Sequence, residues 1–221
     1  MAAGRGTRVG GDTPKQFQLI AGVPMVLRAL RPFAAHPDVA QVVLVLPADA
    51  AAEPPDFLRS LGPGLTIVPG GAARADSVAA GLAALGSGCT IVLVHDAARP
   101  FVERGVIDAV ITHARAGEGA VAAVRVSDTL KEAAADDPCR VARTVARDGL
   151  WRAQTPQGFP RAVLERAHGA ARGDGSAATD DAALVERFGV PVRLVPDSSR
   201  NLKVTTPEDL ALAELLARPG E

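Results

Sequence analysis

The chain is poor in aromatic residues and in cysteine. It has no tyrosine, one tryptophan and two cysteines, and aromatic residues make up 3% of it. Leucine, valine and alanine must therefore fill the core. Cys89 and Cys139 lack metal-ligand spacing and indicate no disulfide framework. There is no signal peptide and no apolar run long enough to span a bilayer. We expect a cytoplasmic protein with reduced thiols and no membrane partner.

The chain also has no excess of positive or negative charge, since its formal net charge is −1 over 221 residues. This balance predicts no nucleic-acid-binding surface. Of the 24 lysines and arginines, only three are lysines: Lys15, Lys131 and Lys203. Arginine serves wherever a positive charge suffices in such a chain, so these positions are candidates for a compact ammonium that arginine cannot replace. Chance placement is the alternative.

Short apolar runs alternate with helical periodicity along most of the chain. Strands are expected at 42–46, 65–68, 90–94, 120–126 and 192–195, because these are continuous apolar runs typical of buried strands. Helical spacing fills the segments between them, and Thr206-Pro207 is a typical helix start. The pattern predicts one α/β domain over 1–221 with a Rossmann-like, mostly parallel sheet flanked by helices.

Residues 127–155 interrupt this alternation. They are extended and partly polar, and we interpret them as a β-arm that leaves the domain. An isolated arm cannot bury its own face, so it is expected to pack on a partner subunit. A disordered loop is the alternative.

The segment from Ala2 to Lys15 contains four glycines, two arginines and a lysine. Glycines let successive backbone N–H groups face one concavity, and the cations add full charges, so the segment is typical of a triphosphate-binding loop. It matches neither the Walker loop nor the dinucleotide fingerprint, because no Gly-Lys-Ser/Thr follows and Val9 replaces the third glycine. A flexible N-terminus is the alternative.

Two further segments follow expected strands, where ligands bind in α/β sheets. Gly70 to Ser77 brings backbone N–H groups, a hydroxyl and an arginine together, although an ordinary strand-to-helix turn would look the same. In His95 to Pro100, Asp96 can hold Mg²⁺ and Arg99 a phosphate; a structural Asp96–Arg99 pair is the alternative. His95 is expected to be packed and hydrogen-bonded. The helical histidines, His168 among them, need no function.

Taken in order, the motifs cover essentially the whole chain. They are Ala2-Ala-Gly-Arg-Gly-Thr-Arg8, Pro14-Lys-Gln-Phe17, Arg74-Ala-Asp-Ser77, Val94-His-Asp-Ala-Ala-Arg-Pro100, Asp128-Thr-Leu-Lys131, Thr155-Pro-Gln-Gly-Phe159 and Asn201-Leu-Lys-Val-Thr205. This set resembles the 2-C-methyl-D-erythritol 4-phosphate cytidylyltransferase family. The resemblance implies cytidylyl transfer from CTP to a polyol phosphate with release of pyrophosphate, in non-mevalonate isoprenoid synthesis. It also implies Mg²⁺ and a homodimer formed by β-arm exchange.

Residue roles carry over from this resemblance by position. Arg8, Lys15 and Lys203 would be catalytic. CTP would be bound by Ala2, Ala3, Gly4, Gly6, Gly71, Arg74 and Ser77. The acceptor and the metal would be surrounded by Asp96, Arg99, Thr129, Arg147 and Thr155, with Asp96 as metal ligand and Arg147 supplied by the neighbouring subunit's arm.

The chain departs from the family pattern at its N-terminus. Family members have an apolar strand before the Ala-Ala-Gly loop, whereas Met1 stands at the end of that strand here. We expect the first strand of the sheet to be missing and the native protein to start upstream of Met1. Two other functions stay open: the same transfer to another acceptor such as ribitol 5-phosphate, and a nucleotide-binding protein disabled by the lost strand.

Overall fold

The computed structural model describes residues 1–4, 13–62, 64–174 and 179–218. The strands are β1 (Leu19–Ile20), β2 (Val23–Pro24), β3 (Val42–Leu46), β4 (Leu65–Pro69), β5 (Ile91–Val94), β6 (Gly119–Arg125), β7 (Leu130–Ala134), β8 (Asp137–Val145), β9 (Trp151–Pro160) and β10 (Val192–Pro196). The α-helices are α1 (Met25–Ala34), α2 (Ala48–Ala52), α3 (Arg74–Ala83), α4 (Arg104–Arg115), α5 (Arg161–Asp174), α6 (Asp181–Glu186) and α7 (Pro207–Leu216). Among the described residues, no helix is both long and apolar enough to cross a membrane.

The predicted α/β fold is confirmed, but its larger sheet is mixed. The strand order is β10-β6-β9-β5, with β10 parallel to β6 and β9 antiparallel to both of its neighbours. The chain leaves the carboxyl end of β6 and returns at the same edge, so β9 must run in the opposite direction. The apolar pattern of the sequence predicted no strand along the whole of 151–160.

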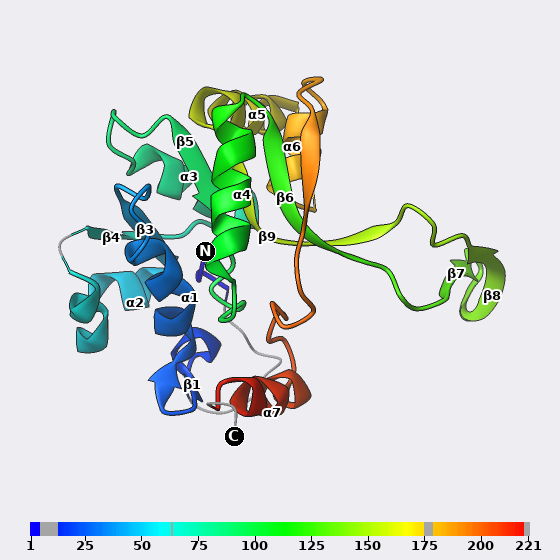
Figure 1. Ribbon diagram of the computed structural model, residues 1–221, viewed down its shortest axis with the longest axis horizontal. Coiled ribbons are helices and arrows are strands. Elements are labelled where there is room, and N and C mark those ends of the chain that lie inside the picture. Colours follow the sequence, from blue (N-terminus) through cyan, green and yellow to red (C-terminus); the bar gives the residue numbers. More distant parts are fainter. Residues whose placement is uncertain (5–12, 63, 175–178, 219–221) are drawn as a thin grey trace.

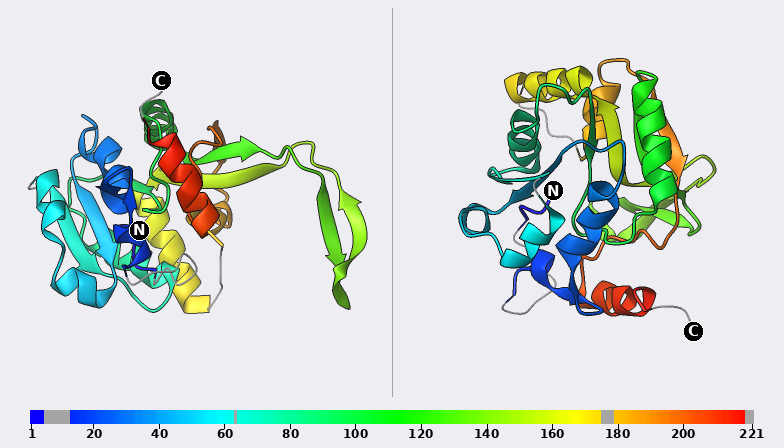
Figure 2. Two further views of the ribbon diagram at one scale, coloured as in Figure 1. Left: turned by 90° about the horizontal axis from the view of Figure 1, so that it is seen from below. Right: turned by 60° about the vertical axis from the view of Figure 1, so that its left-hand side comes forward.

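Helices cover both faces of this sheet. Residues of β6 alternate between the two sides: Ala120 and Ala122 contact the cluster around α4, and Val121 contacts the cluster formed by α3, α5 and α6. Small residues on β6 let these helices approach closely. Figures 1 and 2 show α4 on one side of the strands and α5 and α6 on the other.

The strands β3 and β4 form a separate parallel pair, divided from β5. Met1 and Ala2 bridge the two parts: Ala2 N–H donates to Val45 C=O over 2.9 Å, and Ala97 N–H donates to Met1 C=O over 2.9 Å. The N-terminus thus lies in the middle of the molecule (Figure 1). Further along the facing edges of β3 and β5 lies an apolar cavity of about 270 Å³, lined by residues that include Val43, Val45, Leu82, Ile91 and Leu93.

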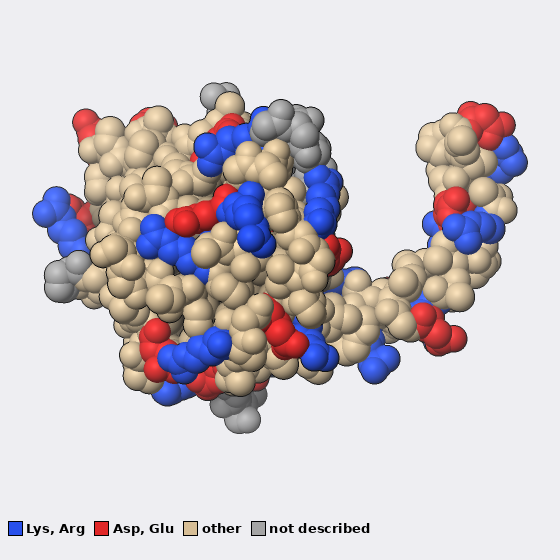
Figure 3. Space-filling model, turned by 90° about the horizontal axis from the view of Figure 1, so that it is seen from above, with Lys and Arg blue, Asp and Glu red and all other residues tan. Residues whose placement is uncertain are grey.

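The excursion expected over 127–155 contains the hairpin of β7 and β8, which projects from the body (Figures 1 and 3). Its last two residues do not belong to this projection. Residues 151–155 begin β9, where Trp151 pairs with Arg125 and Ala153 with Ala123. Gln154 and Thr155 are buried in the body, so the arm is shorter than the sequence predicted.

Candidate active site

Polar groups converge where β5 ends, and one hydroxyl organises them. The Asp96 backbone N–H donates to Thr155 Oγ1 over 3.0 Å, and Thr155 Oγ1 lies 2.9 Å from His95 Nδ1. His95 Nε2 lies 3.0 Å from the Arg99 carbonyl, which only accepts, so Nε2 carries the proton. The Thr155 hydroxyl therefore donates to Nδ1. Burial lowers the pKa of His95 to about 4, which keeps the ring neutral as expected for a packed histidine.

Asp96 is paired with a lysine from the other end of the chain. Lys203 Nζ lies 2.6 Å from Asp96 Oδ2, and the side chain of Asp96 is 15% exposed. Burial alone would raise the pKa of this carboxyl, but the attraction of Lys203, aided by the Met1 ammonium and Arg74, lowers it to about 2. Asp96 is therefore ionised at neutral pH and carries a fixed negative charge into the site.

Asn201 links the segments that present these groups. Its side-chain amide donates to Thr155 C=O over 2.9 Å and to Asp197 Oδ2 over 2.6 Å. The backbone carbonyl of Asn201 accepts from Arg99 Nη1 over 2.7 Å and from Gln154 Nε2 over 3.0 Å. These bonds hold Lys203, two residues further on, beside the end of β5.

Two glycine-containing segments meet at the opposite wall of the site. A Cβ added to Gly70 would lie 2.5 Å from Ala3 Cβ, and one added to Gly71 would lie 2.3 Å from Asp76 Cβ. Such close approach requires glycine at both positions. The Ser77 hydroxyl closes the loop, because it accepts from Gly71 N–H over 3.1 Å and donates to Ala73 C=O over 3.2 Å. Ala3 of the N-terminal segment is thereby packed against the loop that opens α3.

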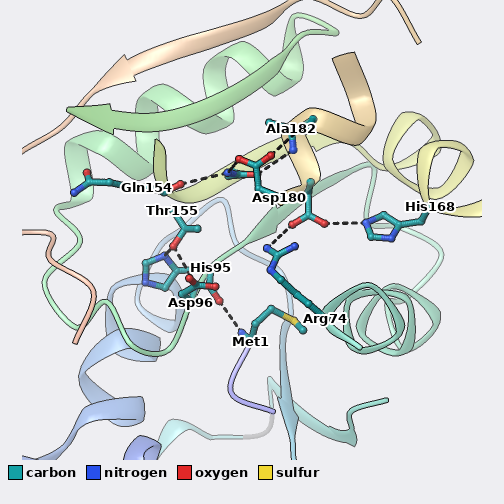
Figure 4. Close-up of polar contacts among 12 residues, drawn as sticks. Met1, Arg74, His95, Asp96, Gln154, Thr155, His168, Asp180 and Ala182 are labelled. Carbon is teal, nitrogen blue, oxygen red and sulfur yellow. Dashed lines mark hydrogen bonds and ion pairs between the residues drawn. The ribbon is translucent and has the colours of Figure 1, made fainter. Parts of the chain in front are cut away.

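Arg74 projects from the first turn of α3 toward α6 (Figure 4). Its Nη2 donates to Asp181 Oδ2 over 2.7 Å, and the side chain is 38% exposed. Burial would lower the pKa of the guanidinium, but the bond to Asp181 raises it above its ordinary value, and Asp96 contributes in the same direction. The site thus combines the cations Arg74 and Lys203, a backbone loop of glycines and one ionised carboxylate, an arrangement suited to polyphosphate.

Comparison with known proteins decides the family. The model of the IspD family, 2-C-methyl-D-erythritol 4-phosphate cytidylyltransferase, matches residues 1–218. The chain belongs to this family. A relative of that name from Salinibacter ruber is 45% identical over 217 residues, which is 97% of this chain and 90% of the relative. One from Streptomyces coelicolor is 45% identical over 227 residues, covering 98% of this chain and 83% of the relative.

Solved structures of the cytidylyltransferase family are similar in fold. The crystal structure of 2-C-methyl-D-erythritol 4-phosphate cytidylyltransferase from Thermus thermophilus superposes with a TM-score of 0.81 at 40% identity, covering 96% of both chains. The chain also matches a bifunctional enzyme IspD/IspF from Solidesulfovibrio magneticus at 46% identity, of which it covers 56%.

The structure brings together most of the residues that the cytidylyltransferase resemblance singled out. Those gathered around the end of β5 and the start of α3 are Ala2, Ala3, Gly71, Arg74, Ser77, Asp96, Arg99, Thr155 and Lys203. The alternative Asp96–Arg99 ion pair is not formed, because Asp96 pairs with Lys203 and Arg99 bonds to Asn201.

Arg8 and Gly6 lie outside the described residues, next to the described and exposed Gly4. Lys15 opens a short 3-10 helix, Lys15–Phe17.

Two predicted residues stand apart from this site within one chain. Thr129 and Arg147 are exposed beside the hairpin of β7 and β8, and Arg147 Nη1 donates to Ser127 C=O. Sequence reasoning also missed residues that the site depends on, namely Asn201, Gln154, Gln157, His168 and Asp181. Asn201 was visible as the start of the Asn-Leu-Lys motif, and Gln157 lies inside the Thr155-Pro-Gln-Gly-Phe159 motif. No local signal marks Gln154, His168 or Asp181, since their partners are distant in sequence.

The donor set around Asp96 fits a magnesium ion shared with a nucleotide. Among the described residues, no three His, Cys, Asp or Glu side chains gather to form a metal cage. Asp96 Oδ2 contacts Lys203, and Oδ1 makes no hydrogen bond to a described residue. Mg²⁺ is commonly held by one or two carboxylates, substrate phosphates and water, so a single ionised carboxylate is sufficient.

Proposed function

We propose that this protein transfers the cytidylyl group of CTP to 2-C-methyl-D-erythritol 4-phosphate, giving 4-diphosphocytidyl-2-C-methyl-D-erythritol and pyrophosphate. The observation that carries the proposal is the 2.6 Å Asp96–Lys203 pair, which lies opposite Arg74 and the glycine wall in a chain of this family. The reaction serves non-mevalonate isoprenoid biosynthesis.

The chemistry requires positioning and charge neutralisation. A phosphate oxygen of the acceptor attacks the α-phosphorus of CTP, and the bond from that phosphorus to the β-phosphate oxygen breaks with its electron pair on pyrophosphate. The nucleophile is already an anion, so no general base is needed. The difficulty is to bring two polyanions together in line, which fixed cations relieve.

Each group of residues has a part in this scheme. The loop from Ala2 to Gly6, with Gly71, Arg74 and Ser77, holds the CTP phosphates. Arg8 and Lys15 stabilise the charge that develops on the transferred and leaving phosphates. Lys203, Arg99 and Thr155 hold the acceptor phosphate beside Asp96. This role is supported by the Lys203–Asp96 pair and by the contacts of Arg99 and Thr155 with Asn201. Magnesium held by Asp96 would neutralise phosphate charge.

We further propose a homodimer in which the β7–β8 arms exchange. Eleven of the fourteen residues of these strands are exposed, and an isolated two-stranded hairpin is marginally stable. Exchange would place Thr129 and Arg147 against the partner's site. We expect the enzyme to work in the reducing cytoplasm, where Cys89 and Cys139 stay as free thiols.

Pyrophosphate release tests the proposed activity. The protein is incubated with CTP and Mg²⁺, with 2-C-methyl-D-erythritol 4-phosphate, with ribitol 5-phosphate, or with no acceptor. Release should depend on an acceptor and be fastest with the methylerythritol phosphate. Equal or faster release with ribitol 5-phosphate would assign the other acceptor, and no release with any acceptor would indicate a binding protein.

A further inference from the structure

A buried chain of hydrogen bonds lies behind Arg74. Asp181 is fully buried and accepts on both carboxylate oxygens: from Arg74 Nη2 over 2.7 Å and from His168 Nε2 over 2.8 Å. His168 is 2% exposed. Burial would raise the pKa of the Asp181 carboxyl, but the bonds from His168 and Arg74 lower it. The carboxylate is thus a charged, two-sided link between a buried ring and a guanidinium that reaches the site.

The position of Asp181 is itself fixed. It is the first residue of α6, whose N-cap, Asp180, accepts from Ala183 N–H over 2.9 Å. Gln157 of β9 secures the same turn, because its amide donates to Asp180 Oδ2 over 2.8 Å and accepts from Ala182 N–H over 3.1 Å. Figure 4 shows Asp180 and Ala182 together at the start of α6, with Arg74 reaching up from below. The strand β9 therefore positions Thr155 on one side of the site and, through Gln157, positions Asp181 on the other side.

The geometry leaves part of Arg74 for a ligand. Only Nη2 bonds to a described residue, so Nε and Nη1 can donate elsewhere. An arginine side chain has many rotamers, and holding it in one of them before the ligand binds reduces the entropy lost on binding. A buried carboxylate fixed by a histidine is suited to do this, because it cannot move away with the guanidinium.

We propose that Asp181, held by His168, is a positioning residue that orients Arg74 toward the triphosphate of CTP. The inference rests on the proposed function, in which Arg74 binds CTP. It gives a role to a histidine for which the sequence indicated none.

A double-mutant cycle separates positioning from general support of the fold. Asp181→Asn keeps the shape of the side chain and removes its charge, and Arg74→Ala removes the group it would orient. Each single variant should raise the KM for CTP about 10-fold or more, as expected for the loss of a charge-assisted hydrogen bond. The KM for the polyol phosphate should change less than about 2-fold. The double variant should be no worse than Arg74→Ala, because Asp181 acts through Arg74.

A histidine series provides the test if Asp181→Asn does not fold. His168→Leu removes the donor to Asp181, and His168→Gln keeps an amide N–H near the position of Nε2. Leucine should raise the KM for CTP, and glutamine should restore most of the affinity. The matched control is His36→Leu. His36 is also buried, and its Nε2 lies 2.8 Å from Asp108 Oδ1, but Asp108 does not contact a described arginine of the candidate site. This variant should keep the wild-type KM for CTP.

The outcomes distinguish this inference from the proposed function. If Arg74→Ala raises the KM for CTP while folded Asp181→Asn or His168→Leu leaves it unchanged, the positioning role is wrong and the proposed function stands. An additive double mutant, or equal effects of His168→Leu and His36→Leu, would also overturn the role. If Arg74→Ala leaves the KM for CTP unchanged, the assignment of Arg74 to the CTP site fails, and the positioning role fails with it.

Discussion

The three lysines of this arginine-rich chain occupy different environments. Lys203 pairs with Asp96 in the site. Lys131 lies on the arm, where its Nζ donates to Thr144 Oγ1 over 2.7 Å across the β7–β8 pair. Lys15 is half-buried in the turn that follows the glycine-containing segment. Scarcity of lysine therefore pointed to a residue that lies in the candidate site, Lys203, but Lys131 makes a contact that arginine could also make.

Lys15 provides a prediction at this scale. Lys15→Ala should lower kcat by about two to three orders of magnitude, as for the loss of other preorganised charge stabilisers. Lys15→Arg should also be slow, because the guanidinium is larger and planar. Steady-state turnover with saturating CTP and acceptor measures both. Near-normal turnover in Lys15→Ala would remove Lys15 from the catalytic set.

His95 provides a prediction on pH. Its pKa is about 4 in the folded chain, against 6.5 for an exposed histidine. The unfolded state therefore binds more protons between these values, so this group favours folding above pH 6.5 and loses that contribution as pH falls toward 4. The full effect is about 3 kcal/mol.

Urea unfolding at several pH values between 4 and 7 measures the contribution of His95. The free energy of unfolding should rise with pH more steeply in the wild type than in His95→Gln, which can still donate to the Arg99 carbonyl. Parallel curves for the two proteins would show that His95 does not titrate as described.

At the scale of elements, the open edges of β3 and β5 define a second prediction. Each strand lacks a partner on the side facing the apolar cavity, within the described residues. Fusing five apolar, β-branched residues ahead of Met1, the length of β3, should fill the cavity and pair both edges. A gain of about 2 kcal/mol would raise the melting temperature by roughly 4–8 °C.

The fusion needs a control for the buried N-terminus. The Met1 ammonium donates to His95 C=O over 2.6 Å, and burial lowers its pKa to about 6. Any fusion converts this amino group into a peptide N–H, so a fused Gly-Ser segment of equal length is the matched control. The apolar fusion should melt above both the control and the unfused chain. Equal melting temperatures for the two fusions would contradict strand pairing in the cavity.

Sequence patterns predicted the elements that are continuous apolar runs, and missed those that are not. The five expected strands are present as β3, β4, β5, β6 and β10. Burial explains the apolar runs of β3 and β6. In contrast, β4 and β10 are more exposed although they are also apolar. The strand β9 escaped prediction because its buried positions include Gln154, Thr155 and Gln157, and it also contains Pro156 and Gly158. The same polar residues organise the site through partners 23 to 60 positions away in sequence. Local patterns carry no information on such contacts.

At the scale of the whole molecule, the arm is the part that lacks a core of its own. The hairpin of β7 and β8 stands away from the body in Figure 3, and Val141 on it is 54% exposed. Ion pairs such as Arg143–Glu132 lie on its surface and contribute little to stability. A surface of this kind is expected to be covered by a second copy of the chain.

Mixed dimers test whether Arg147 acts on the partner's site. Arg147→Ala and Lys15→Ala subunits are each expected to form poorly active dimers. If Arg147 acts across the interface, a hybrid of the two contains one site with both residues intact, so mixing should restore up to about half of the wild-type activity per hybrid. Differently tagged subunits allow the hybrid to be purified and assayed. A purified hybrid as inactive as either parent would assign Arg147 to its own subunit.

The central claim is that the acceptor phosphate attacks CTP directly in the site formed by Asp96, Lys203, Arg74 and the glycine wall. The most direct measurement is ³¹P NMR of the products formed from CTP and 2-C-methyl-D-erythritol 4-phosphate whose phosphate oxygens carry ¹⁸O. The account predicts a new diphosphate with ¹⁸O in its bridging position and an equal amount of unlabelled pyrophosphate. Label in the pyrophosphate, or no new diphosphate while CTP is consumed, would contradict it.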